Sequence, residues 1–178
     1  GLFLFSLGSF LTIQANIGLA PWEAFSMGCT YLTDLSYGDI VVITGLIIIL
    51  IDLALKEKIG FGTILNAILI GKFVDLIQYT DSIPQMTTIE LGLVMLLAGQ
   101  VIICIGSYFY IGASLGCGPR DALMGALGKR LPSVPIGAIR GLLEGTVLII
   151  GWLLGAKVGL GTVISVLGIG VILQFHFN

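Results

Sequence analysis

Charged residues are scarce in this chain of 178 residues, which contains 8 lysines and arginines and 10 aspartates and glutamates. Charged residues make up 10% of the sequence and hydrophobic residues 57%, and the mean hydropathy is +1.11. A soluble domain needs about a quarter of its residues charged to cover its exterior. The composition therefore excludes a water-facing surface and predicts an integral membrane protein whose outside contacts the lipid bilayer.

Basic, metal-ligating and redox-active residues are also few. The formal net charge of -2 provides no basic surface for nucleic acid. One histidine, His176, and three separated cysteines form no metal-ligand cluster. No two of the cysteines are spaced as a CxxC motif, so we interpret all three as small apolar packing residues: Cys29, Cys104 and Cys117. The sequence predicts no nucleic-acid partner, no metal site and no cofactor.

Catalytic motifs are missing as well. The chain has no Ser/His pair, no paired aspartates typical of an intramembrane protease and no HExxH motif, and His176 has no evident partner in the sequence. We therefore predict that the protein is not an enzyme.

Long apolar runs dominate what is present. They do not alternate as the short strands of an outer-membrane barrel would, and each is about long enough to cross a 30 Å hydrocarbon layer as an α-helix. The first run lacks the basic start of a signal peptide, and we interpret it as a span. Because the chain begins at Gly1 rather than Met, we expect a short N-terminal piece to precede it. The runs cover residues 1–17, 39–55, 62–79, 89–112, 136–154 and 161–177.

Two shorter and more polar segments, Gly18–Leu32 and Gly116–Arg130, share a helix-start pattern. In each, a proline suits the first helical position, where the missing N–H costs nothing, and an acidic residue two positions later complements the helix dipole. We predict a short helix after a helix-breaking turn in each segment. The residues that define the pattern are Gly18, Pro21 and Glu23 in the first segment and Gly116, Pro119 and Asp121 in the second.

This recurrence extends into an internal duplication. The sequence aligns with itself at an offset of about 98 residues, which becomes 99 after the short helix. Over about seventy residues, this alignment pairs glycine, proline, acidic, lysine and threonine positions. We predict a first repeat at 1–79, a linker at 80–88 and a second repeat at 89–178, each with three long transmembrane helices and one short Pro-initiated helix. Aligned positions include Pro21 with Pro119, Glu23 with Asp121, Gly38 with Gly137, Lys58-Ile-Gly-Phe-Gly-Thr63 with Lys157-Val-Gly-Leu-Gly-Thr162, and Gly71 with Gly170.

The orientation of the repeats depends on whether the short helices cross the membrane. Cytoplasmic loops carry an excess of lysine and arginine. If the short helices do not cross, only Lys157 opposes the basic residues Lys56, Lys58, Arg120, Lys129 and Arg130, whereas crossing short helices would divide these residues more evenly. We therefore predict six crossings, inverted repeats and a cytoplasmic N-terminus. Inverted repeats with interrupted helices are typical of transporters.

At these motifs the sequence resembles the YczE/YyaS/YitT family of bacterial integral membrane proteins, and most closely its YczE branch. The resemblance covers essentially the whole chain and implies a multi-pass protein of the bacterial cytoplasmic membrane. Relatives usually have Gly-Pro-Trp-Asp in the first repeat, where this chain has Ala20 and Glu23. Lys72 replaces a residue expected to be uncharged. The matching motifs are Gly18-Leu-Ala-Pro-Trp-Glu, residues 60–75, Leu115-Gly-Cys-Gly-Pro-Arg-Asp-Ala-Leu-Met124 and Arg140-Gly-Leu-Leu-Glu144.

Several charged residues lie inside the predicted helices. Arg140 and Glu144 are four residues apart on one helix face, so we expect them to pair inside the bundle, as a structural ion pair or as a substrate or ion contact. Arg120 and Asp121 are either an anchor and a helix cap or part of an anion site at a helix N-terminus. The candidate substrate-binding residues are Glu23, Asn66, Arg120, Asp121, Arg140 and Glu144.

Other polar and aromatic residues favour local roles. The spacing of Lys72 and Asp75 allows a pair within one helix, and Asp52 with Lys56 forms an i,i+4 spacing near a helix end, close to water. Two tryptophans, Trp22 and Trp152, are more typical of interfacial anchors than of ligand contacts.

Together these features favour a small-molecule transporter or permease with its site at the repeat interface. The alternative is a non-transporting scaffold or accessory subunit of a membrane complex. The predicted partners are the lipid bilayer and either a small-molecule substrate or another membrane protein, with a homo-oligomer as a further possibility.

Overall fold

The protein is all-helical in a computed structural model that describes residues 1–176, with side chains described through Gly168 and at Val171. The side chain of His176 therefore lies outside the described residues. Every regular element in the described part is an α-helix, as predicted. The helices are α1 (Leu2–Gln14), α2 (Pro21–Leu32), α3 (Tyr37–Ala54), α4 (Phe61–Tyr79), α5 (Ile89–Gly112), α6 (Pro119–Arg130), α7 (Ile136–Leu153) and α8 (Leu160–His176).

Within the described residues, four helices are long and apolar enough to cross a membrane: α3, α4, α5 and α7. α1 is shorter than its apolar run because the chain turns after Gln14: Asn16 has a φ of 57° and Gly18 a φ of 130°, both outside the helical region. Residues 80–88 contain no helix, since α4 ends at Tyr79 and α5 begins at Ile89. This segment coincides with the predicted linker.

The two short helices begin at the predicted prolines. Ala20 and Gly118, the residues before Pro21 and Pro119, have extended backbone conformations, with ψ values of 157° and 155°. A residue before proline is pushed into this region by the proline ring, which stops any preceding helix and starts the next.

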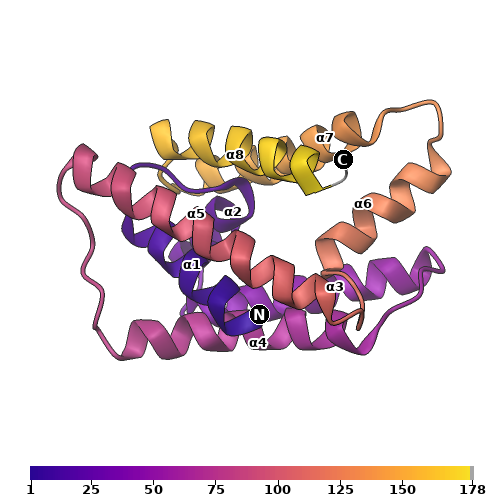
Figure 1. Cartoon of the computed structure of the whole chain (residues 1–178), viewed down its shortest axis with the longest axis horizontal. Helices are drawn as coiled ribbons and strands as arrows, with labels where there is room; N and C mark the ends of the chain where they lie inside the picture. Colours follow the sequence, from indigo (N-terminus) through magenta and orange to yellow (C-terminus); the bar gives the residue numbers. More distant parts are fainter. Residues whose placement is uncertain (177–178) are drawn as a thin grey trace.

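The centre of the molecule is the crossing of α1 and α5, with α3 and α4 along one edge and α7 and α8 along the other (Figure 1). Glycines allow this close approach: a Cβ at Gly8 would lie 2.6 Å from the Gly99 carbonyl oxygen, and a Cβ at Gly106 would lie 2.9 Å from that of Gly1. Small residues that bring backbones together are the usual basis of helix association in lipid.

Each short helix packs on a long helix of the other half of the chain, α2 on α7 and α6 on α3. A Cβ at Gly28 of α2 would meet the Gly151 carbonyl oxygen of α7 at 3.0 Å. The two halves are therefore interlocked rather than placed side by side.

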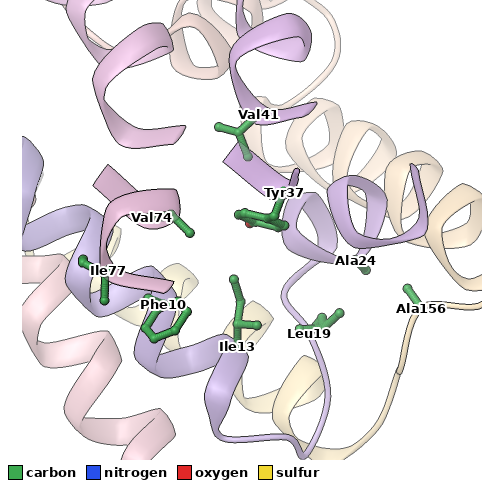
Figure 2. Close-up of a cluster of buried hydrophobic side chains, with 9 residues drawn as sticks. All are labelled: Phe10, Ile13, Leu19, Ala24, Tyr37, Val41, Val74, Ile77 and Ala156. Carbon is green, nitrogen blue, oxygen red and sulfur yellow. The ribbon is translucent and has the colours of Figure 1, made fainter. Parts of the chain in front are cut away.

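A buried apolar cluster joins the first-half helices to the turn that precedes α8 (Figure 2). It includes Phe10 and Ile13 of α1, Tyr37 and Val41 of α3, and Val74 and Ile77 of α4, together with Leu19, Ala24 and Ala156. Ala156, from the α7–α8 turn, is 4% exposed in this cluster, so the second half contributes to the core of the first.

The turn before α4 is bonded to the turn before α6. Gly62 N–H donates to the Leu115 carbonyl oxygen at 2.8 Å, and the Thr63 hydroxyl donates to the Cys117 carbonyl oxygen at 2.6 Å. Both acceptors lie in the Gly116 turn, where Gly116 has a φ of 121°. These bonds satisfy carbonyl groups that the break between α5 and α6 leaves outside a helix.

The turn before α8 is bonded to the turn before α2 in the same way. Gly161 N–H donates to the Ile17 carbonyl oxygen at 2.9 Å, and the Thr162 hydroxyl donates to that of Leu19 at 2.6 Å. Each Gly-x-Gly-Thr segment thus holds the Gly-x-x-Pro turn of the opposite half. This gives the glycines and threonines of both segments a structural role.

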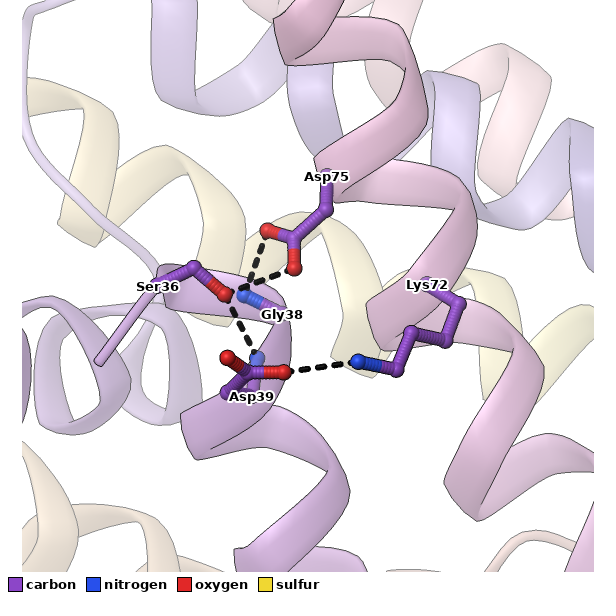
Figure 3. A network of polar contacts seen from close by, with 5 residues as sticks. All are labelled: Ser36, Gly38, Asp39, Lys72 and Asp75. Carbon is purple, nitrogen blue, oxygen red and sulfur yellow. Dashed lines mark hydrogen bonds and ion pairs between the residues drawn. The ribbon is translucent and has the colours of Figure 1, made fainter.

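A polar clasp, formed by Ser36, Gly38, Asp39, Lys72 and Asp75, closes α3 onto α4 (Figure 3). The Asp75 carboxylate accepts hydrogen bonds from the Ser36 hydroxyl at 2.7 Å and from Gly38 N–H at 2.9 Å. Lys72 forms an ion pair with Asp39 at 2.7 Å. The pair between Lys72 and Asp75 that the spacing allows is not the one formed, because Asp75 accepts hydrogen bonds from the start of α3 and Lys72 binds Asp39.

Candidate functional site

A buried carboxylate stands at the start of α2. Glu23 is 8% exposed and accepts hydrogen bonds from the hydroxyls of Ser9 and Thr12 on α1, both at 2.9 Å. Its second oxygen accepts a longer bond, 3.4 Å, from the Ala20 N–H at the helix start. The position of Glu23 in the first helical turn explains this backbone contact, and the small polar residues of α1 supply the rest.

The starts of the two short helices meet through Trp22 and Arg120, the residues that follow Pro21 and Pro119. The Arg120 guanidinium carbon lies 4.5 Å from the centre of the Trp22 ring, within the range of a cation–π contact. Arg120 is also within electrostatic range of Glu23 on the other short helix. Trp22 is half-buried here, in contact with a charged side chain.

The pair Arg140–Glu144 on α7 is formed, as predicted. Arg140 Nε donates to Glu144 Oε1 at 3.0 Å, and the two side chains are 19% and 15% exposed. An i,i+4 spacing brings the two groups together on one face of the helix. Each charge is thereby compensated within the same helix turn.

Asp121 and Asn66 lie near the start of α6. A Cβ at Gly118 would be 3.5 Å from Asn66 Oδ1 and 3.6 Å from Asp121 Oδ2, so both side chains border the same glycine. Asp121 is exposed and is within electrostatic range of Arg140, Arg120 and Glu144. The absence of a side chain at Gly118 leaves room between the amide and the carboxylate.

We define the charged cluster as Glu23, Arg120, Asp121, Arg140 and Glu144. All of its members were predicted as site residues, and they come from three helices, α2, α6 and α7. With Asn66 at its border, the cluster offers two guanidinium groups and three carboxyl groups. Such a set can bind a solute that carries both an anionic and a cationic group.

The structure corrects the interpretation of Asp52. Asp52 is fully buried in the last turns of α3, and no ion pair with Lys56 is formed within the described residues. Lys56 lies after the helix end, with a φ of 61°, so its side chain leaves the α3 face on which i,i+4 partners meet. Spacing alone gave no signal that another helix would cover this carboxylate.

A shallow cavity of about 160 Å³ lies apart from the charged cluster. It is lined mainly by apolar residues where the start of α1, the end of α5 and the start of α4 meet, among them Leu2, Leu65 and Phe109. Its lining contains no member of the charged cluster. The charges and their neighbours therefore define the candidate site, not the cavity.

The sequence matches a family model described as DUF6198, a family of unknown function, over residues 1–178. The chain belongs to this family. It is 32% identical to an uncharacterized protein of Haemophilus influenzae, over 98% of this chain and 79% of that protein. No solved structure matches the chain.

Two proteins of Bacillus subtilis are also similar to this DUF6198 member. The uncharacterized membrane protein YczE is 30% identical over 98% of this chain and 81% of YczE, and the uncharacterized protein YyaS is 25% identical over 98% and 87%. The resemblance found from the sequence motifs is confirmed. With its apolar helices, this family relationship makes the chain a membrane protein.

Proposed function

We propose that this protein is a multi-pass transporter or permease of the bacterial cytoplasmic membrane, built from two inverted repeats, which moves a small charged or zwitterionic solute. The observation that carries the proposal is the meeting of Trp22 and Arg120 at the starts of α2 and α6, next to the remaining carboxyl and guanidinium groups of the charged cluster. Transporter sites are typically formed where interrupted helices from two repeats meet.

The reciprocal turn contacts support a two-fold relation between the two repeats. Thr63 bonds the turn before α6, and Thr162 bonds the turn before α2, at the same distance and with aligned partners in the two halves. Such an exchange is expected when two similar units are related by a two-fold axis. The contacts of α2 with α7 and of α6 with α3 follow the same exchange.

Contacts among the basic residues support the proposed orientation. Lys129 pairs with Glu57 at 3.0 Å, and Arg130 donates to the Leu55 carbonyl oxygen at 2.8 Å, so the end of α6 adjoins the α3–α4 turn. Lys157 instead donates to the Asn16 carbonyl oxygen at 2.6 Å. This arrangement fits a cytoplasmic face rich in lysine and arginine and an opposite face with few of them.

Cysteine labelling tests the orientation. In a variant whose native cysteines are replaced by alanine, cysteines at Lys56 and Lys129 should react with a membrane-impermeant reagent only from the cytoplasmic side. Cysteines at Asp81 and Lys157 should react only from the other side. Labelling of the Lys56 and Lys129 positions from opposite sides would contradict the inverted arrangement.

Tryptophan fluorescence offers a direct test of solute binding. The protein has two tryptophans, and Trp152 is 62% exposed, so Trp152→Phe leaves Trp22 as the reporter of the site. Amino acids, organic acids and amines would be titrated against this variant in nanodiscs. We expect one class to change the Trp22 emission saturably, and Arg120→Ala to abolish the response.

Flux in proteoliposomes then separates transport from binding. The solute that changes Trp22 emission should accumulate in vesicles that contain the protein, and Glu144→Gln should abolish flux in protein that still inserts and folds. If no solute is bound or moved and the protein instead purifies in fixed ratio with another membrane protein, the scaffold function replaces the transport function.

A further inference from the structure

One buried carboxyl group lies outside the charged cluster. Asp52 is 0% exposed, and neither of its carboxylate oxygens has a hydrogen-bond partner within the described residues. Aspartates inside transmembrane helices are rare, and they are expected to be paired or to have a function. An unpartnered one therefore requires an explanation.

The position of Asp52 on α3 follows from helix geometry. Gly38, Gly45 and Asp52 are spaced by seven residues and so share one face of the helix. Gly38 packs against Gly71, and a Cβ at Gly45 would lie 3.0 Å from that of Ala67, so this face is the one covered by α4. Because α3 and α4 form a helical hairpin, Asp52 lies near the start of α4.

Three structural elements meet around this carboxyl group. The start of α4 is bonded through Thr63 to the Cys117 carbonyl oxygen in the turn before α6, and α6 packs on α3. Asp52 is within electrostatic range of Cys117 in the turn before α6, in agreement with these contacts. Asp52 is thus enclosed at the junction of α3, α4 and the α6 turn.

The charged groups near this junction do not compensate a negative charge on Asp52. Lys129 is paired with Glu57, Arg130 is bonded to the Leu55 carbonyl oxygen, and Glu57 itself is negative and within electrostatic range of Asp52. Lys56 and Lys58 are exposed in the α3–α4 turn. The C-terminal end of α3 adds the negative pole of the helix dipole.

A carboxylate ion in these surroundings would be buried without a partner, which is among the most unfavourable states for a side chain in a protein. We propose that Asp52 is a proton-binding site: it carries a proton in this conformation and exchanges it when the end of α6 moves away from α3. Protonation removes the charge and leaves a neutral group that the apolar junction can enclose.

The ion pair that joins the end of α6 to the α3–α4 turn can open. The Lys129 side chain is 71% exposed in its pair with Glu57, and a Cβ at Gly125 of α6 would have no neighbour within 4 Å. Exposed ion pairs contribute little stability. A small displacement of the end of α6 would therefore admit water to Asp52.

Carbodiimide labelling tests proton occupancy without any transported solute. Dicyclohexylcarbodiimide enters membranes and reacts with protonated carboxyl groups in apolar surroundings. After treatment of the protein in nanodiscs, peptide mass spectrometry should find an adduct on Asp52 whose yield falls about tenfold per pH unit once the group titrates. Asp39, on the same helix but exposed and paired with Lys72, is the matched control and should stay unmodified.

Two variants complete the test. Asp52→Asn should lose the adduct and fold normally, since the amide has the shape of the protonated acid. Glu57→Gln, which removes the neighbouring charge, should keep the adduct and shift the fall in its yield to lower pH. Absence of an adduct on wild-type Asp52 at acidic pH, or an adduct suppressed by sodium and insensitive to pH, would overturn the proposal.

The outcome is independent of the proposed transport function. Labelling reports on Asp52 alone, whereas the Trp22 fluorescence and flux experiments report on the charged cluster. A labelled Asp52 in a protein that moves no solute would leave the proton site valid and the transport function refuted.

Discussion

The helix pairs α3–α4 and α7–α8 occupy corresponding places in the two halves of the sequence, yet they differ in how they are held. α3 and α4 pack closely along their length and are closed by the polar clasp. Within the described residues, α7 and α8 do not form a comparable contact, and α8 leans on α5. For glycines of α7 that would line a tight interface, such as Gly137 and Gly141, no described residue lies within 4 Å of an added Cβ.

The sequence explains much of this difference. If the two halves are the repeats that we propose, the clasp residues Asp39, Lys72 and Asp75 correspond to Ala138, Val171 and Gln174, none of which carries a charge. The glycines needed for close approach occur in both halves, at Gly38 and at Gly137. Small residues therefore permit two helices to pack closely. In the first half, the polar contacts of the clasp stabilise the packed pair. We expect the second half to rearrange more readily than the first.

The largest expected effect comes from filling a glycine contact in the closed pair. In Gly71→Leu, the new side chain would meet the Gly38 carbonyl oxygen and the Val42 side chain. We expect the free energy of unfolding to fall by about 3 kcal/mol or more, since the two helices must move apart to make room for the added side chain. The matched control is Gly141→Leu on α7, where space is open, and its thermal unfolding midpoint in detergent should stay near that of the wild type. Equal losses in the two variants would contradict the difference between the halves.

A second effect contrasts two carboxyl groups on corresponding faces of α3 and α7. Glu144→Gln leaves Arg140 without its partner in a mostly buried site and should cost about 2 kcal/mol. Asp52→Asn has no partner to leave behind and should change stability by about 0.5 kcal/mol or less. Denaturation of both variants in the same detergent checks this order.

The double variant Arg140→Met, Glu144→Leu sharpens this prediction. Replacement of both ions by apolar residues of similar size removes the uncompensated charge, so stability should recover toward the wild-type value. A double variant as unstable as Glu144→Gln alone would mean that the ion pair is not the cause of the loss.

The next effect concerns the clasp itself. Asp75→Ala removes two hydrogen bonds to the start of α3, from the Ser36 hydroxyl and from Gly38 N–H, and should cost about 1–2 kcal/mol. Asp75→Asn keeps one acceptor oxygen and should lie between the alanine variant and the wild type. Thermal unfolding midpoints of the three proteins provide the comparison.

The smallest effect is expected at the exposed side of the clasp. In the ion pair between Lys72 and Asp39, the side chains are 54% and 38% exposed, so Lys72→Met should leave the thermal unfolding midpoint close to that of the wild type. Raised salt should weaken the wild-type pair and bring the two unfolding midpoints together. A loss as large as that of Asp75→Ala would show that the ion pair, rather than the cap on α3, closes the helices.

Local sequence signals predicted the local structure well. Pro21 and Pro119 start their helices as expected, because proline restricts the backbone whatever surrounds it. Arg140 and Glu144 form their pair because four residues complete about one helix turn. The long apolar runs of residues 39–55, 62–79, 89–112 and 136–154 became helices with nearly the predicted bounds.

Contacts between distant segments could not be read from spacing. Lys72 has the carboxylate of Asp75 three residues away on its own helix. Its partner is nevertheless the carboxylate of Asp39, which lies on α3. Asp52 was expected near water because it is close to a helix end, but its side chain is fully buried. Which face of a helix is covered depends on the packing of the whole bundle, and the sequence of that helix alone does not determine it.

The exchanged turn contacts have a consequence for biosynthesis. When the first half emerges from the ribosome, the carbonyl oxygens of Ile17 and Leu19 have no donors, because those donors are Gly161 and Thr162 near the end of the chain. The packing of α2 likewise cannot be completed until α7 has been synthesised. The closely packed pair α3–α4 can form within the first half, whereas α2 and the turn before it complete their contacts only after the last two helices are inserted. The two halves made as separate polypeptides should accumulate only when they are produced together.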